Sequence, residues 1–180
     1  MIDRTAPACR GASVLGLVLA LLACSGGAAC AAPPELKAWR GPAPKFALAD
    51  AQGAQHALAA GPVDITIVHF FATWCESCRT ELPSLVRLAK RAGPGARVIA
   101  ISVAEPDMRV RRFLAKSETG FPVLLDRDRS VARAWGVATL PTSFVLNGAL
   151  APMLAAQTTV DWDRFEPQQI STQATSAEAR

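Results

Sequence analysis

Apolar residues along the chain fall into continuous runs and periodic runs. Residues 63–71 form a mostly apolar run rich in β-branched side chains, which is typical of a central strand buried on both faces. In residues 79–91 apolar side chains recur at helical spacing, and Gly93-Pro94-Gly95 ends that pattern. Residues 97–103 form a second continuous run. The pattern therefore predicts a buried strand, a helix and a second buried strand.

Shorter elements are predicted on both sides of this unit. Residues 46–58 predict two short strands joined by a turn at Gln52-Gly53. Residues 107–116 predict a helix whose inner side carries Met108, Phe113 and Leu114. The rest of the chain predicts, in order, a short strand at 121–125, a short helix at 130–135 closed by Gly136, a strand at 142–146, a two-residue hairpin at Asn147-Gly148 returning through 149–155, and a terminal helix at 161–170.

This order of elements predicts an α/β sandwich with a mixed sheet, because strands first alternate with helices and then form a hairpin. The folded domain is expected to span residues 45–170. Residues 32–44 contain four prolines and are expected to form a linker. Residues 171–180 are small and polar and are expected to form a disordered tail.

The first 31 residues have the layout of a secretory signal. Arg4 and Arg10 precede thirteen uncharged, mostly apolar residues at positions 11–23. The segment could be processed in three ways. The first is cleavage at Ala29-Cys30-Ala31, and the second is lipid attachment to Cys24 in a lipoprotein box at 21–24. A third is an uncleaved membrane anchor, since no charge occurs from residue 11 to residue 34. Each of the three predicts a periplasmic or otherwise extracytoplasmic domain.

Composition excludes several classes of protein. Hydrophobic residues make up 51% of the 180 residues, which excludes disorder as the main state. The net charge of +4 includes no basic run longer than Arg111-Arg112, so no nucleic-acid partner is expected. Five cysteines are too few for a disulfide scaffold, and three of them lie in the first 30 residues. Only Cys75 and Cys78 can belong to the folded core.

Cys75 and Cys78 lie where a buried strand turns into a helix, and this setting is typical of a redox site. The helix N-terminus favours the thiolate of Cys75, so Cys75 is the predicted nucleophile. Cys78, one turn further in, would resolve a mixed disulfide by attacking the sulfur of Cys75. The alternatives are an inert structural disulfide or half of a zinc knuckle, which needs a second ligand pair although the only histidines are His56 and His69.

Residues 70–83, FFATWCESCRTELP, resemble the active-site segment of the thioredoxin superfamily, in particular its exported, membrane-tethered TlpA/ResA-like branch. Three further segments resemble that branch in the same order: APKFAL at 43–48, FPVLLD at 121–126 and GVATLPTSF at 136–144. The resemblance covers about residues 43–166. It implies a thioredoxin-like three-layer α/β/α sandwich with a mixed central sheet, and a redox-active disulfide in place of a bound cofactor.

The resemblance also implies roles for residues around the cysteines. A cis peptide is expected between Leu140 and Pro141, facing Cys75, where the adjacent backbone would pair with substrate; the alternative is a proline at the start of a strand. Glu81 matches the family's acid on the active-site helix and is expected to relay protons, or else to be an exposed carboxylate. Trp74 is expected to cover the site and Glu76 to face solvent.

The sequence departs from the family pattern at three places. Ser77 stands where many relatives have proline. His69 stands where thioredoxins have an acid and the TlpA/ResA-like branch often an amide; a neutral His69 either shuttles a proton from Cys78 or is a satisfied core side chain. Gln157-Thr158-Thr159 replaces the usual glycine, which leaves the register of the last strand open.

The expected function is that of an exported thiol:disulfide oxidoreductase that reduces disulfides of substrate proteins as a monomer. Its electrons would come from a thiol protein in the membrane, and apocytochrome c is one class of substrate that such relatives serve. The alternative is a metallochaperone that binds Cu(I) through Cys75 and Cys78, although copper-delivery relatives space their cysteines by three and add a histidine. A disulfide isomerase would need a dimerisation domain, for which 180 residues leave no room.

The N-terminal pattern leads to a direct test of location. We expect fractionation of native cells to recover the protein outside the cytoplasm. Mass spectrometry of its N-terminus then shows whether the segment is cleaved, lipidated or retained as an anchor. A mature start at Cys24 bearing lipid would select the lipoprotein branch. Recovery of a cytosolic chain that retains residues 1–31 would contradict the prediction of export.

Overall fold

The fold is described here from a computed structural model, for residues 33, 35–167 and 170. The predicted signal or anchor at 1–31, with Cys24, and the predicted tail at 171–180 lie outside these residues. Among the described residues, no helix has both the length and the apolar character that a membrane crossing requires.

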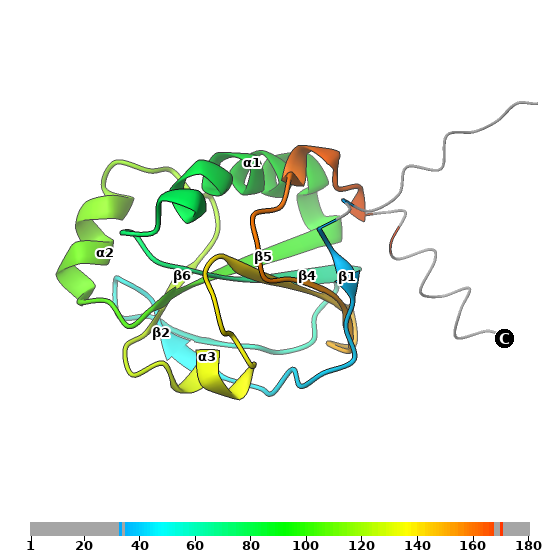
Figure 1. The fold of residues 1–180 in the computed structure, drawn as a ribbon, viewed down its shortest axis with the longest axis horizontal. Coiled ribbons are helices and arrows are strands. Elements are labelled where there is room, and N and C mark those ends of the chain that lie inside the picture. Colours follow the sequence, from blue (N-terminus) through cyan, green and yellow to red (C-terminus); the bar gives the residue numbers. More distant parts are fainter. Residues whose placement is uncertain (1–32, 34, 168–169, 171–180) are drawn as a thin grey trace, which may run out of the picture.

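Six strands form the central sheet in the order β1-β8-β7-β4-β5-β6 (Figure 1). Their bounds are β1 Lys37–Ala38, β4 Ile65–Phe71, β5 Ala96–Val103, β6 Val123–Asp126, β7 Thr142–Asn147 and β8 Pro152–Ala156. β4 is parallel to β5 and antiparallel to β7, so the sheet is mixed as the sequence predicts. A second, two-stranded sheet pairs β2 Ala47–Ala49 with β3 Gln55–Ala57.

The helical elements are α1 Glu76–Ala92, η1 Gly93–Gly95, α2 Asp107–Leu114, α3 Ser130–Ala134 and η2 Trp162–Arg164. α1, α2 and η2 cover one face of the sheet, and α3 covers the other together with β2 (Figure 1). The three layers of the predicted sandwich are therefore present.

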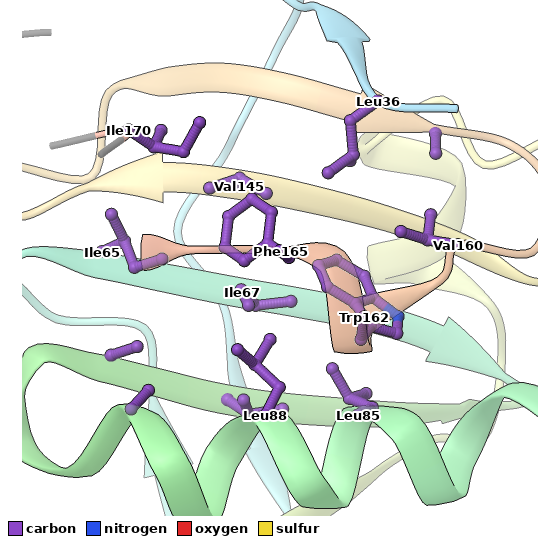
Figure 2. Close-up of a cluster of buried hydrophobic side chains, with 14 of the residues drawn as sticks. Leu36, Ile65, Ile67, Leu85, Leu88, Val145, Val160, Trp162, Phe165 and Ile170 are labelled. Atoms are coloured by element: carbon purple, nitrogen blue, oxygen red, sulfur yellow. The ribbon is translucent and has the colours of Figure 1, made fainter. Parts of the chain in front are cut away.

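All seven residues of β4 are buried, and they supply both faces of the core. Successive side chains of a strand point to opposite faces. Ile65 and Ile67 belong to the cluster under α1 with Leu85 and Leu88, and Figure 2 shows Trp162 and Phe165 in the same cluster. Val68 and Phe70 belong to the cluster on the α3 side, with Phe46, Trp135 and Phe144.

The inner face of α2 differs from the prediction. Met108 is 56% exposed, whereas Val110 is fully buried and Phe113 and Leu114 are half-buried. Residues 110, 113 and 114 share one helical face, and a residue two positions before Val110 points to nearly the opposite side. Periodicity placed the helix correctly but assigned Met108 to the wrong face.

The hairpin between β7 and β8 is present, but its turn is longer than two residues. Leu150 N–H donates to the Asn147 carbonyl at 2.8 Å, and Leu150, not Gly148, holds the left-handed backbone with φ 66°. Gly148 is needed for another reason, because a Cβ there would lie 2.7 Å from the carbonyl oxygen of Val63. The register of β8, which the sequence left open, includes an irregularity between Val145 and Leu146.

The two ends of the domain also differ from the expectations. Residues 32–44 were expected to form a linker, yet Lys37 and Ala38 pair with β8 and extend the central sheet. The helix expected at 161–170 starts as the single 3-10 turn η2, and Phe165 is already extended, with ψ 122°. The break covers Phe165 and Glu166, and Glu166 precedes a proline, a position that avoids the helical region; Pro167 and Ile170 are helical again.

Candidate active site

Cys75 and Cys78 form a disulfide bond at the N-terminus of α1, with an S–S distance of 2.08 Å. Cys75 is the N-cap residue, and its Sγ accepts a hydrogen bond from the Cys78 N–H at 3.2 Å. The Ser77 hydroxyl lies 3.4 Å from the same sulfur. Cys75 is 7% exposed and Cys78 is fully buried. The outer sulfur therefore lies where helix N–H groups stabilise a thiolate, as the sequence predicts.

A buried carboxylate that the sequence did not single out holds the loop before Cys75. Glu105 accepts hydrogen bonds from the Thr73 N–H at 2.8 Å, the Thr73 hydroxyl at 2.5 Å and the Ser102 hydroxyl at 2.7 Å. Its only sequence signal is a charged residue close behind the apolar strand β5 and directly before Pro106. Glu105 thus fixes the backbone two residues before the disulfide.

The peptide bond between Leu140 and Pro141 is cis. Leu140 packs against the cluster of buried residues that contains Cys75 and Cys78. The Thr142 hydroxyl donates to the Thr139 carbonyl at 2.7 Å and closes the loop on its other side. The loop and the cysteines are therefore brought together from positions more than 60 residues apart.

Glu81 lies on α1 three residues after Cys78 and is only 2% exposed, so it is not a surface carboxylate. Its Oε1 accepts a hydrogen bond from the Trp162 indole N–H at 2.6 Å, while its buried Oε2 has no partner in the described part of the chain. Burial raises the pKa of Glu81 from 4.5 to about 7, against the opposing hydrogen bond from Trp162. Such a carboxyl group can hold or release a proton near neutral pH.

His69 lies on β4 and is fully buried. Its Nδ1 is 2.9 Å from the Ser143 hydroxyl and 4.0 Å from Oε1 of Glu81, and its ring stacks on Phe71. Burial lowers the pKa of His69 from 6.5 to about 4, so the ring is neutral at pH 7. The ring is satisfied at Nδ1 only, because the buried Nε2 has no hydrogen-bond partner among the described residues.

Trp74 and Glu76 lie on the outer surface beside the disulfide. Trp74 is 62% exposed and Glu76 faces solvent, as the sequence predicts for Glu76. Trp74 lines an open hollow together with Cys75 and Ser77. It also lines a pocket of about 300 Å³ together with the 137–140 loop.

No group of three histidine, cysteine or acidic side chains that could hold a metal ion occurs within the part of the chain that the structure describes. His56, which the zinc alternative would need, instead bonds the Asp50 carboxylate at 2.7 Å in the β2–β3 hairpin.

The sequence matches a protein-family model over residues 40–150, which is more than half of the chain. The chain belongs to the AhpC/TSA family. Both halves of the candidate site, the cysteine pair and the cis-proline loop, lie inside the matched segment of this thioredoxin-like family.

Curated relatives carry the name thiol-disulfide oxidoreductase ResA. The chain is 33% identical to that of Geobacillus thermodenitrificans over 106 residues, which cover 58% of this chain and 61% of the relative. It is 35% identical to that of Bacillus subtilis over 106 residues, covering 58% and 59%. The match therefore spans about three fifths of the length of these relatives.

Solved structures share the fold. A putative thiol:disulfide interchange protein DsbE from Chlorobium tepidum is 24% identical, with a TM-score of 0.62 over 79% of this chain and 98% of its own. A thiol:disulfide interchange protein of the thioredoxin family from Chlorobium tepidum TLS is 28% identical, with a TM-score of 0.59 over 77% and 98%.

The buried pair His69 and Glu81 leads to a prediction about stability and pH. The folded state keeps His69 neutral down to about pH 4, whereas an unfolded histidine gains its proton near 6.5, so this residue makes stability fall as the pH drops through that window. The folded state keeps Glu81 protonated up to about pH 7, whereas an unfolded glutamate loses its proton near 4.5, so this residue makes stability fall as the pH rises through that window. The two slopes cancel between about pH 4.5 and 6.5.

Single substitutions should therefore expose opposite slopes. Relative to the unsubstituted protein, we expect the unfolding free energy of Glu81→Gln to rise with pH between about 4.5 and 6.5, and that of His69→Asn to fall. Urea unfolding at half-unit pH steps measures both. Parallel pH profiles for all three proteins would contradict the protonation states assigned to the pair.

Proposed function

We propose that this chain is a thiol:disulfide oxidoreductase whose reaction centre is the Cys75–Cys78 pair. The observation that carries the proposal is the disulfide at the N-terminus of α1, with its outer sulfur at the helix end and the cis-proline loop packed beside it. The names of the ResA relatives support the same reaction class.

The proposed reaction transfers two electrons from the chain to a substrate disulfide. The Cys75 thiolate attacks one substrate sulfur, forms a mixed disulfide and releases the other sulfur as a thiolate. The Cys78 thiolate then attacks Sγ of Cys75, which releases the second substrate sulfur and leaves the Cys75–Cys78 disulfide. A dithiol donor must reduce this disulfide before the next turnover.

Glu81 is the proposed proton acceptor for the second step. Residues three apart on a helix have Cβ atoms about 5–6 Å apart, which brings the Glu81 carboxyl group to the same side of α1 as Cys78. The Cys78 thiol loses its proton to the carboxylate as it becomes a nucleophile, and the proton returns when the disulfide is reduced again. With a pKa of about 7, Glu81 is suited to both directions of transfer.

The proposal extends to location and partners. The N-terminal segment favours a domain that acts outside the cytoplasm, anchored or free, as a monomer. In that oxidising environment a reductase needs a thiol protein of the membrane as its electron donor. Substrate proteins with accessible disulfides, apocytochromes c among them, would approach Cys75 through the open hollow beside Trp74, next to the pocket lined by the 137–140 loop.

Two cysteine variants separate the roles of the sulfurs. We expect Cys75→Ser to abolish turnover with a protein disulfide, because the attacking sulfur is lost. We expect Cys78→Ser to form the mixed disulfide but not resolve it, so that covalent complexes accumulate on non-reducing gels. Full reductase activity of Cys75→Ser would contradict the proposed centre.

The direction of electron flow is tested by the reduction potential of the Cys75–Cys78 couple. Strong oxidants of this fold have reduction potentials of about −120 mV, and thioredoxin has one of about −270 mV. We expect a potential nearer that of thioredoxin. The Glu76 carboxylate beside Cys75 disfavours a second negative charge, so the reduced form with its Cys75 thiolate is less stabilised than in a strong oxidant. Equilibration with glutathione, followed by mass spectrometry of alkylated thiols, gives the potential, and a value near about −120 mV would identify an oxidant instead.

A further inference from the structure

The residue that contacts Glu81 comes from the far end of the domain. Trp162 is fully buried in the cluster under α1 (Figure 2). Its indole N–H donates to Oε1 of Glu81 at 2.6 Å. The proposed reaction accounts for Glu81 but gives no reason for a tryptophan at this place.

The helix that carries Glu81 also fixes the segment that carries Trp162. Arg87 of α1 binds both carboxylate oxygens of Asp163, with distances of 2.9 and 2.6 Å. Arg91 of α1 donates to the carbonyl oxygen of Trp162 and, at 2.9 Å, to that of Phe165. These contacts hold η2 against α1 at Trp162 and at the residues that follow it, which restricts where the indole can lie relative to Glu81.

The two carboxyl oxygens of Glu81 consequently differ. An indole N–H can only donate, so Oε1 is held as an acceptor and is a poor place for a proton. Oε2 is buried and has no partner among the described residues, which leaves it as the oxygen that takes the proton. The other titratable group facing the carboxyl is His69 of β4, which is neutral and has its Nδ1 4.0 Å from Oε1. Cys78 lies on the same helix, three residues before Glu81. Asp163 of η2 is paired with Arg87 and Arg91.

We propose that Trp162 is a positioning residue for the proton transfer: its N–H holds Oε1 of Glu81 and leaves Oε2 to exchange a proton with Cys78. This inference rests on the proposed function. In the step itself, the Cys78 thiol and the Glu81 carboxylate become the Cys78 thiolate and the Glu81 carboxylic acid. A donor at Oε1 favours the carboxylate before the transfer, so Trp162 keeps Glu81 able to accept a proton at neutral pH.

The decisive variant is Trp162→Phe, made in the full chain, because it keeps a ring in the core and removes only the donor. We expect the titration midpoint of Glu81 to rise by about one to two pH units, the worth of one hydrogen bond to a charged group. NMR titration of the oxidised protein labelled with ¹³C at glutamate carboxyls measures this midpoint, and the loss of one resonance in Glu81→Gln assigns it.

Trp135→Phe is the matched control. Trp135 is equally buried and its indole N–H donates to the Pro44 carbonyl at 3.0 Å, but it lies in the cluster on the other face of the sheet. We expect Trp135→Phe to leave the Glu81 midpoint unchanged. A general loosening of the core would move the midpoint in both variants.

The rate of the resolving step gives a second readout. With oxidised glutathione as the substrate, we expect the midpoint of the pH dependence of the Cys78 attack rate to rise by the same amount in Trp162→Phe. In a Glu81→Gln background, we expect Trp162→Phe to leave that midpoint unchanged. If Trp162→Phe does not fold, the indole ¹H–¹⁵N resonance of Trp162 in the unsubstituted protein should still titrate with Glu81, and that of Trp135 should not.

An unchanged Glu81 midpoint in folded Trp162→Phe, or an indole resonance of Trp162 that does not titrate with Glu81, would overturn the inference. Either result would leave the roles of Cys75 and Cys78 intact, whereas activity of Cys75→Ser would overturn the proposed function and leave the indole contact standing.

Discussion

The packing of α1 against β4 is the interaction on which the rest of the structure depends. Leu85 and Leu88 cover Ile65 and Ile67, and this contact fixes both the position and the direction of the helix. The N-terminus of α1 then lies directly beyond the end of β4, so the strand-to-helix turn places a cysteine at the helix cap. The position of Cys75 at the helix cap is thus a by-product of how an apolar strand and an apolar helical face meet.

The same interface carries two titratable groups whose charged forms burial disfavours. His69 and Glu81 occupy the region where the sheet and α1 exclude water, and each has one hydrogen-bonding partner and one bare atom. A fully apolar interface would be the simpler way to hold a helix on a sheet, because unpartnered buried polar atoms reduce stability. Polar groups kept at such a cost next to a reactive pair are typical of a functional site.

Local patterns predicted the parts of the fold that depend on neighbours in sequence. The buried run at β4, the periodicity of α1 and the two-residue spacing between Cys75 and Cys78 are all of this kind. The cis peptide before Pro141 came from resemblance to a family. Glu105 and Trp162 could not be found in this way, because their partners lie 32 and 81 residues away and neither belongs to a motif. Gly148 was assigned to a turn, whereas the backbone of Val63 is what excludes a side chain there.

The short strand β1 has a consequence for how the domain is delimited. An unpaired strand edge attracts other chains, and β8 would present such an edge if β1 were missing. At the opposite edge, a single bridge between Asp50 and Leu124 places the β2–β3 hairpin beside β6. Truncation near position 40, where the family match begins, would remove β1 and leave the edge of β8 unpaired. Two residues that the sequence assigns to the linker therefore cover the edge of β8 and belong to the domain.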